Sequence, residues 1–145
     1  MILLDTGPIV AFFDASDAYH TLCIETLKGI NEPIVTTWPV LTEAFYLLGF
    51  SWKAQDNLWE FMMRGGVEIL SLDVRQQARC RQLMGKYRDL PMDLADGTLV
   101  VLAESKKIKK IFTLDHKDFR TYRPAHTKRF KLFPTPASFT SPRRP

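Results

Sequence analysis

The stretch MILLDTGP at residues 1–8 decides how the rest of the chain is interpreted. Its apolar residues run without interruption until they meet an acid at Asp5, a hydroxyl at Thr6 and then a Gly-Pro pair. Such a run is typical of a buried strand, and the pair after it is typical of a turn. In open parallel sheets, ligands bind in the crevice outside the carboxyl ends of the strands. The opening residues therefore predict a buried strand that delivers Asp5 to a candidate site.

Downstream of this stretch, strand-like and helix-like patterns alternate. Helices are indicated where a capping residue precedes a longer apolar pattern, as at Thr37, Ser51, Asp73 and Asp93. The expected strands cover residues 2–4, 33–36, 67–70, 110–113 and, more weakly, 130–132; the expected helices cover 8–13, 19–28, 38–48, 52–64, 74–86 and 94–105. This alternation predicts an α/β fold with a central, mostly parallel sheet.

The composition narrows the class of protein. A length of 145 residues suits one domain, and hydrophobic and charged fractions of 46% and 25% are typical of a soluble globular protein. We expect a single domain over residues 1–134 and a flexible C-terminal tail, rich in proline and serine, over 135–145. No segment approaches a membrane span, and the N-terminus lacks the basic region of a secretory signal. The sequence therefore predicts a cytoplasmic protein with no membrane association.

Basic residues are concentrated in the last third of the chain. Residues 1–104 carry 8 basic and 14 acidic side chains, whereas residues 105–145 carry 12 basic and 2 acidic ones. Aromatic residues, namely Phe119, Tyr122 and Phe130, are interleaved with the basic ones. A solvated basic face is one interpretation, and contacts to the phosphates of a polyanion are the other. The candidate RNA-binding residues are Lys117, Arg120, Arg123, Lys128 and Arg129.

Two further acids, Glu43 and Asp115, lie at positions where a charged side chain is unusual. Glu43 lies in the middle of a helix that is apolar nearly all round and is expected to be largely buried. An unpaired carboxylate there costs several kcal/mol, so the alternatives are a salt bridge or a solvent-facing position. Asp115 follows the strand at 110–113, with Thr113 beside it, as Asp5 follows the first strand. An Asx-turn is the alternative role for Asp115.

Asp93 and Asp96 stand three residues apart at the start of the helix expected over 94–105. Asp93 is in the position of an N-cap, which contributes roughly 1 kcal/mol, and capping is its favoured role. Asp96 could serve the helix dipole, but the same location aims its side chain toward the sheet edge. Gly97 leaves room for a close approach of backbone, metal or ligand. We therefore count Asp96 among the candidate site residues and Asp93 as a supporting one.

Four carboxylates in one pocket would repel one another by several kcal/mol and would require positive counter-charge. An all-oxygen set of Asp5, Glu43, Asp96 and Asp115 favours Mg²⁺, with Mn²⁺ as a substitute, over Zn²⁺. A water polarised by such an ion is suited to the hydrolysis of a phosphodiester. The acids thus predict a metal-dependent hydrolase.

Taken in order, these motifs resemble those of PIN-domain proteins of the VapC-like toxin ribonuclease kind. The resemblance is carried by ILLDT at residues 2–6, the isolated helical Glu43, DLADGTLVVLAE at 93–104 and IFTLDHKDF at 111–119. It implies a Rossmann-like three-layer α/β/α sandwich. It also implies a Mg²⁺-dependent endoribonuclease that hydrolyses RNA phosphodiester bonds as the toxin of a type II toxin–antitoxin pair.

The resemblance assigns roles and partners as well. The catalytic and metal-binding acids would be Asp5, Glu43, Asp96 and Asp115, supported by Asp93, Thr6 and Thr113. The implied partners are an RNA substrate, a cognate antitoxin that blocks the site, and a second copy of the chain in a homodimer. One departure is Gly97, where such motifs commonly have Ala; it should loosen the helix by roughly 1 kcal/mol.

Two other classes of function remain open at this point. A phosphatase or phosphate-accepting switch also places an Asp after the first strand, but it would need a second acid close by, and residue 7 is Gly7. A non-catalytic RNA-binding or regulatory module with a PIN-like fold is disfavoured because it would not need four mutually repelling acids. The tryptophans Trp38, Trp52 and Trp59 are expected to form core or dimer contacts rather than stacking surfaces for bases.

Overall fold

Five short parallel strands form one sheet in the order β3-β2-β1-β4-β5. The computed structural model describes residues 1–90 and 92–140. The strands are β1 (Ile2–Leu4), β2 (Ile34–Thr36), β3 (Glu68–Ile69), β4 (Lys110–Phe112) and β5 (Lys131–Phe133). Because every pair is parallel, all the carboxyl ends meet at one edge. The predicted parallel α/β fold is confirmed, including its weak fifth strand.

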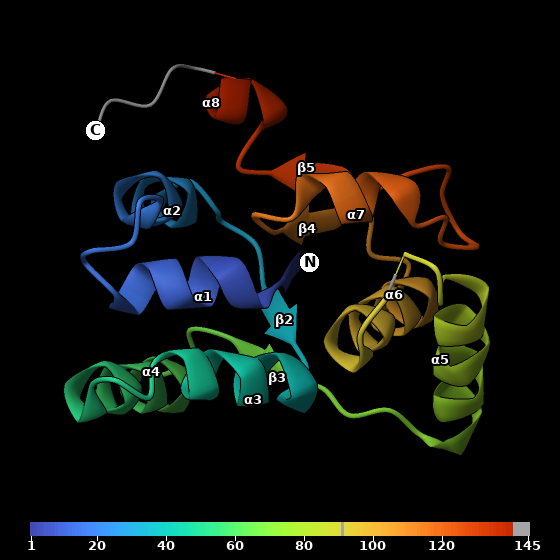
Figure 1. Cartoon of the computed structure of the whole chain (residues 1–145), viewed down its shortest axis with the longest axis horizontal. Helices are drawn as coiled ribbons and strands as arrows, with labels where there is room; N and C mark the ends of the chain where they lie inside the picture. The colour runs from blue at the N-terminus through green and yellow to red at the C-terminus, as the bar shows by residue number, and fades with distance from the viewer. Residues whose placement is uncertain (91, 141–145) are drawn as a thin grey trace.

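Helices cover both faces of this sheet. They are α1 (Thr6–Phe13), α2 (His20–Lys28), α3 (Trp38–Leu47), α4 (Trp52–Met63), α5 (Val74–Lys86), α6 (Leu94–Lys106), α7 (His116–Thr121) and α8 (Pro136–Thr140). Figure 1 shows α1, α2 and α4 on one side of the strands and α5 and α6 on the other. This arrangement is the predicted three-layer α/β/α sandwich. No helix in the described ranges is long and apolar enough to cross a membrane.

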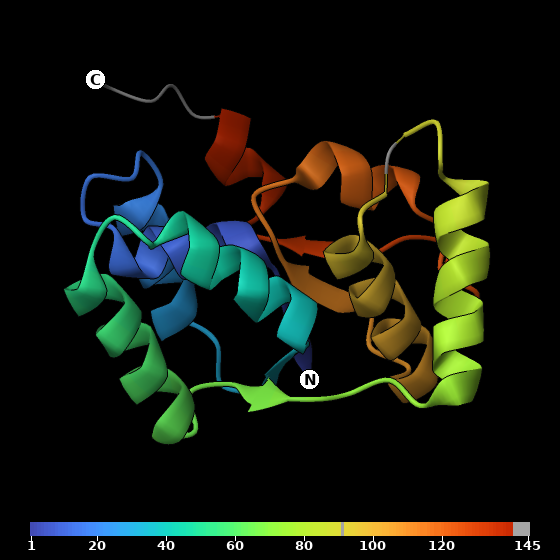
Figure 2. The same ribbon diagram turned by 60° about the horizontal axis from the view of Figure 1, so that its bottom comes forward.

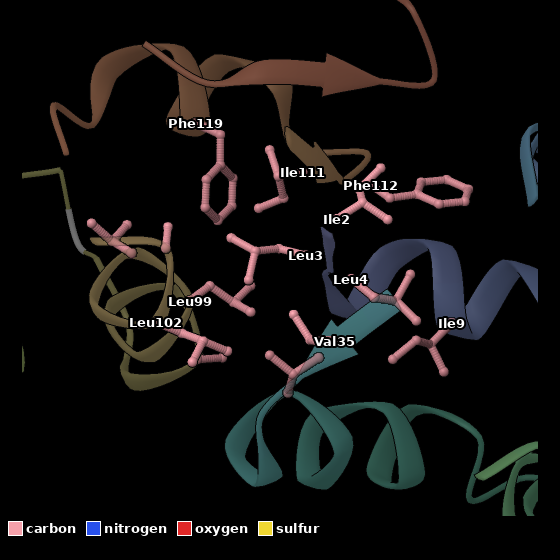
Figure 3. Close-up of a cluster of buried hydrophobic side chains, with 14 of the residues drawn as sticks. Ile2, Leu3, Leu4, Ile9, Val35, Leu99, Leu102, Ile111, Phe112 and Phe119 are labelled. Carbon is pink, nitrogen blue, oxygen red and sulfur yellow. The ribbon is translucent and has the colours of Figure 1, made fainter. Parts of the chain in front are cut away.

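The central strand β1 is buried on both faces, which explains its uninterrupted apolar sequence. Figure 3 shows Leu4 and Phe112 on the side of α1, and Leu3 and Ile111 on the side of α6 and α7. The rings of Phe12 and Phe112 pack edge to face at 5.6 Å between centroids. Layers of apolar side chains on both faces therefore hold β1 and β4 side by side.

Backbone hydrogen bonds continue past the strand ends and fix the residues that follow. The N–H of Asp5 donates to the carbonyl of Phe112 at 2.9 Å, and the N–H of Thr113 donates to the carbonyl of Phe133 at 2.8 Å. Asp5 and Thr113 are consequently held at the same edge of the sheet, as the sequence predicted for a strand that delivers an acid.

Besides shifts of one residue at several element ends, three features differ from the expectation. Helix α1 begins at Thr6 rather than at Pro8, and α7 forms over a segment that was not predicted to be helical. Within the expected flexible tail over 135–145, Pro136–Thr140 form α8; residues 141–145 lie outside the described residues. Pro136 suits the first turn of a helix, where its missing N–H has no partner to lose.

The expectation that α3 is largely buried is also wrong. Only one side of it, with Val40, Leu41 and Ala44, lies in the core, and Tyr46 on the other side is 83% exposed. The three tryptophans are likewise exposed at the surface rather than buried in the core: Trp38, Trp52 and Trp59. An apolar pattern on all sides of a helix does not by itself show which side meets the sheet.

Candidate active site

A cavity of about 410 Å³ lies where β1 and β4 end beside the first turns of α6 and α7. It brings together all four acids that the sequence singled out, although they are far apart in the chain. The lining residues are Asp5, Thr6, Gly7, Glu43, Asp93, Asp96, Leu114, Asp115 and Asp118. The cavity thus collects six carboxylates from four segments of the chain.

Asp5 is buried at the floor of the cavity and is linked to Asp115 through a threonine. The Thr113 hydroxyl donates to Asp5 Oδ2 at 2.7 Å and accepts the N–H of Asp115 at 2.9 Å. Burial raises the pKa of the Asp5 carboxyl to about 6, with a smaller contribution from repulsion by Asp115 and Asp93. The hydrogen bond from Thr113 opposes this rise. The predicted supporting residue Thr113 therefore orients one acid and anchors the loop of another.

Asp96 is the most strongly perturbed acid of the cavity. Its Oδ2 accepts a hydrogen bond of 2.7 Å from the Tyr122 hydroxyl. Burial, followed by repulsion from Asp5, raises the pKa of Asp96 to about 8. Burial and the adjacent Asp96 raise the pKa of the Tyr122 phenol well above its usual range, so its hydroxyl stays protonated and donates. Asp93 caps α6 by accepting the N–H of Asp96 at 2.8 Å, as predicted.

Glu43 reaches the cavity from the middle of α3. The hydroxyl of Thr6, in the first turn of α1, donates to Glu43 Oε1 at 2.9 Å. Glu43 is half-buried, and burial together with the charge of Asp93 raises its pKa above the usual range. Among residues 1–90 and 92–140, Glu43 forms no salt bridge, so that alternative is not found there, and its carboxylate accepts a hydrogen bond from Thr6 instead.

Two residues of the site were missed from the sequence. Asp118 lines the cavity, and burial together with the neighbouring Asp115 raises its pKa to about 6. Asp115 and Asp118 have the same spacing as Asp93 and Asp96, and that repeat was the available signal. Tyr122 was interpreted as part of a basic surface, but it is fully buried.

No basic side chain is among the described residues that line the cavity, so positive charge reaches it only from outside, as from Lys117 near Asp118. Within residues 1–90 and 92–140, no three acidic, histidine or cysteine side chains already form an arrangement that could hold a metal ion. The hydroxyls of Thr6, Thr113 and Tyr122 instead hold three of the acids individually. The cavity is thus an all-oxygen site of high negative charge without a closed coordination shell.

The predicted RNA-binding residues lie outside the cavity. Lys117 and Arg120 are exposed on α7, and Lys117 is near enough to lower the pKa of Asp118. Arg123, Lys128 and Arg129 are exposed farther along the chain. By contrast, the aromatic residues interleaved with them are buried, which excludes base contacts for Phe119, Tyr122 and Phe130 as they stand.

Two glycines near the acids serve packing. A Cβ on Gly7 would lie 3.2 Å from Leu114, so this glycine lets the start of α1 approach the loop after β4. A Cβ on Gly97 would lie 2.8 Å from Cys80 Sγ on α5. The close approach that Gly97 permits is therefore that of side chains on α5.

Comparisons with known proteins agree with this geometry. The model of the PIN domain family matches residues 2–123. Ribonuclease VapC26 of Mycobacterium tuberculosis is 26% identical over 135 residues, covering 92% of this chain and 100% of the relative. These findings confirm the resemblance to PIN-domain proteins of the VapC-like ribonuclease kind.

Solved structures share the fold. VapC20 of Mycobacterium tuberculosis, a toxin that cleaves the sarcin-ricin loop, has a TM-score of 0.78 at 18% identity, covering 88% of this chain and 99% of its own. VapBC2 of Rickettsia felis, bound to a DNA fragment from its promoter, has a TM-score of 0.58 at 20% identity, covering 83% and 92%. Sequence and structure together show that the chain belongs to the PIN domain family.

Proposed function

We propose that this protein is a metal-dependent endoribonuclease and the toxin of a type II toxin–antitoxin pair. The observation that carries the proposal is the cavity in which six carboxylates meet and three of them have pKa values raised to about 6 or 8. Uncompensated negative charge of this kind is stabilised by hard cations. Its family membership and its similarity to a ribonuclease named VapC26 support RNA as the substrate.

Mg²⁺ is the proposed cofactor, with Mn²⁺ as a substitute, because all the donors are oxygens. Asp5 and Asp96 would hold the principal ion, and Asp115 and Glu43 would complete the pocket or hold a second one. A bound ion of this type supplies charge stabilisation and a polarised water for attack on a phosphodiester. A cation would also lower the raised pKa values of Asp5 and Asp96 and keep both carboxylates charged.

The chain's own residues position these groups. Thr113 orients Asp5, Tyr122 orients Asp96, and Thr6 orients Glu43, each through a hydrogen bond of 2.7 to 2.9 Å. The phosphates of the RNA would be held by the exposed cations on and after α7: Lys117, Arg120, Arg123, Lys128 and Arg129. The cations would bind the RNA backbone, and the acid cavity would carry out the cleavage. With this separation, the phosphates that flank the cut would not have to lie against the carboxylates.

The test is cleavage of an RNA panel that includes single strands, hairpins and a sarcin-ricin loop fragment, with Mg²⁺, Mn²⁺ or EDTA. We expect cutting with either ion, and none with EDTA or in a folded Asp5→Asn variant. Retained cleavage by Asp5→Asn would contradict the assignment of the site. RNA that is bound but uncut under every condition would favour the alternative, a non-catalytic RNA-binding module with a PIN-like fold.

A cognate antitoxin and homodimerisation are the proposed associations. Exposed large apolar side chains on α3, on α4 and between them, here termed the α3–α4 surface, are Tyr46, Leu47, Phe50 and Met63. Large exposed apolar patches mark interaction sites, and we assign this one to the antitoxin. Light scattering on the purified chain and on Leu47→Asp tests the assignment. An unchanged dimer mass is expected, whereas a fall to the monomer mass would assign the surface to the second copy.

An RNA substrate is also consistent with the cytoplasmic location that the sequence predicted. A sarcin-ricin loop fragment is included in the RNA panel because VapC20, which cleaves that loop, shares the fold at 18% identity.

A further inference from the structure

Neighbouring cavities follow one another along the surface between α3 and α6, beginning at the acid cavity. A cavity of about 430 Å³ shares Glu43 and Asp93 with the acid cavity. A third cavity, of about 510 Å³, shares Trp38, Pro39 and Leu94 with the second one. Figure 2 shows the first turn of α3 directed toward α6, with the connection from β3 to α5 passing below them. The three cavities are thus neighbours that share walls, and the acids line the first of them.

The second and third cavities, together termed the Trp38 groove, are lined mainly by apolar side chains that face solvent, and Gln77 and Arg81 also line the third cavity. Trp38 is 48% exposed and Leu94 is 53% exposed, and they lie at the first positions of α3 and α6. Behind them, the hydroxyls of Thr37 and Thr98 are hydrogen-bonded at 2.7 Å, which ties the start of α3 to α6. Thr37 therefore links two helices instead of capping α3 with its side chain. The backbone that carries Trp38 is consequently held in place against α6.

We propose that the Trp38 groove binds an unstacked nucleobase next to the scissile phosphate, with the base stacked on the Trp38 indole. The inference rests on the proposed ribonuclease function and names how that site selects its substrate. Glu43 and Asp93 lie where the groove meets the acid cavity and repel phosphates there, so the neutral base rather than the backbone enters this end. The exposed cations of α7, Lys117 and Arg120, take the backbone. Single-stranded RNA is recognised in this way, through bases splayed onto aromatic side chains.

The matched control is Trp52. It occupies the first position of α4, as Trp38 does in α3, and it is 68% exposed, but it does not line the Trp38 groove. Trp38→Ala, Trp38→Phe and Trp52→Ala would be compared in an Asp5→Asn background that binds without cutting. The probes are a single-stranded RNA octamer and the same octamer with an abasic site at the nucleotide flanking the cut. Melting temperatures verify that each variant is folded.

We expect Trp38→Ala to weaken octamer binding by about 10- to 100-fold, the range for loss of one stacked base. Trp38→Phe should recover part of the loss, and Trp52→Ala should bind as the background does. The abasic octamer should bind Trp38→Ala and the background equally, because the base that Trp38 contacts is missing. If the unsubstituted chain binds and cuts RNA but Trp38→Ala binds the octamer as tightly as the Asp5→Asn background does, the proposed role of the Trp38 groove is wrong and the proposed ribonuclease function stands.

Two other outcomes would also overturn the groove. If the unsubstituted chain neither binds nor cuts RNA, the proposed function fails and the groove fails with it. If Trp38→Ala loses affinity together with a fall in solution mass by light scattering, the Trp38 groove is an interface between two copies of the chain.

Discussion

The first turns of α6 and α7 have the same spacing of aspartates, but the second aspartate is more buried in α6 than in α7. Each begins with an aspartate cap and has a second aspartate three residues later, namely Asp93 and Asp96 in α6 and Asp115 and Asp118 in α7. In both, the cap accepts the N–H of the second aspartate, at 2.8 Å in α6 and 3.4 Å in α7. Both second aspartates line the acid cavity.

The difference lies in what surrounds the second aspartate. Asp96 faces the buried Asp5 and is held by Tyr122, and its pKa is raised to about 8. Asp118 stands near the exposed Lys117, which opposes the rise, and its pKa reaches about 6. Identical spacing therefore yields a central acid in one helix and a peripheral acid in the other, because burial and neighbouring charge decide the role.

The largest expected effect separates these two acids directly. Asp96→Asn should lower RNA cleavage by at least about 100-fold, since an ion ligand supplies several kcal/mol of charge stabilisation. Asp118→Asn should lower it by less than about tenfold, because that acid lies at the rim. Single-turnover cleavage rates at saturating Mg²⁺ measure both. Equal losses in the two variants would remove the distinction between a central and a peripheral acid.

Tyr122→Phe tests the hydrogen bond from the Tyr122 hydroxyl to Asp96, which has no counterpart at Asp118 among the described residues. Removing the hydroxyl takes away the hydrogen bond that lowers the pKa of Asp96, so the carboxylate is less well oriented and harder to ionise. The ring would stay packed against Phe119 and Tyr87. We expect cleavage to fall by roughly 10-fold and more Mg²⁺ to be needed, as for other groups that orient a metal ligand. An unchanged Mg²⁺ requirement would mean that Tyr122 serves stability alone.

The pH dependence of stability without metal provides a third comparison. The folded-state pKa values of Asp96 and Asp5, about 8 and about 6, exceed the ordinary 3.8, so the folded chain binds protons that the unfolded chain releases. This contribution to stability is complete below pH 3.8 and is lost as the pH rises through 6 and 8. The melting temperature in EDTA should therefore fall between pH 5 and pH 8.5 because of these groups. Asp96→Asn should reduce the change in melting temperature with pH more than Asp118→Asn does. The reverse order would contradict the conclusion that Asp96 is the more buried acid.

The smallest effect concerns the packing that supports the start of α6. Gly97→Ala adds a Cβ 2.8 Å from Cys80 Sγ and 3.3 Å from Met84 Cγ, so we expect a loss of about 1 kcal/mol in the free energy of unfolding despite better helix propensity. In a Cys80→Ala background the same change should be neutral or stabilising. Gly85→Ala in α5 is the control, because a Cβ there would meet no atom within 4 Å and should stabilise by about 1 kcal/mol. Denaturant unfolding measures all three. Equal losses in both backgrounds would exclude the contact with Cys80 as the cause.

The sequence predicted the elements that carry a strong local signal. The buried run at Ile2–Leu4 and the caps Ser51, Asp73 and Asp93 are found where they were expected, since each depends on neighbouring residues. The convergence of Asp5 and Asp115 followed from the parallel sheet, whose strands end at one edge, whereas Glu43 and Asp96 join them from the helices α3 and α6. Their roles as catalytic and metal-binding groups remain predictions.

What was missed depends on contacts between distant segments. Helix α7 has six residues, too few for a periodic pattern, so Asp118 was not recognised as a helix-start acid. Phe119 and Tyr122 lie three residues apart with exposed residues between them, and only the packed structure shows that they face inward. Gly97 was interpreted from its own helix, whereas the atom that explains it belongs to Cys80 on α5.

Direct Mn²⁺ binding to the unsubstituted chain, Asp96→Asn and Asp118→Asn, followed by electron paramagnetic resonance, tests the central claim that the acid cavity is a divalent-metal centre organised around Asp96. We expect the unsubstituted chain and Asp118→Asn to bind Mn²⁺, with Mg²⁺ as a competitor, and Asp96→Asn to lose at least about tenfold in affinity. Equal Mn²⁺ affinity in all three proteins, or no binding by the unsubstituted chain, would contradict the claim.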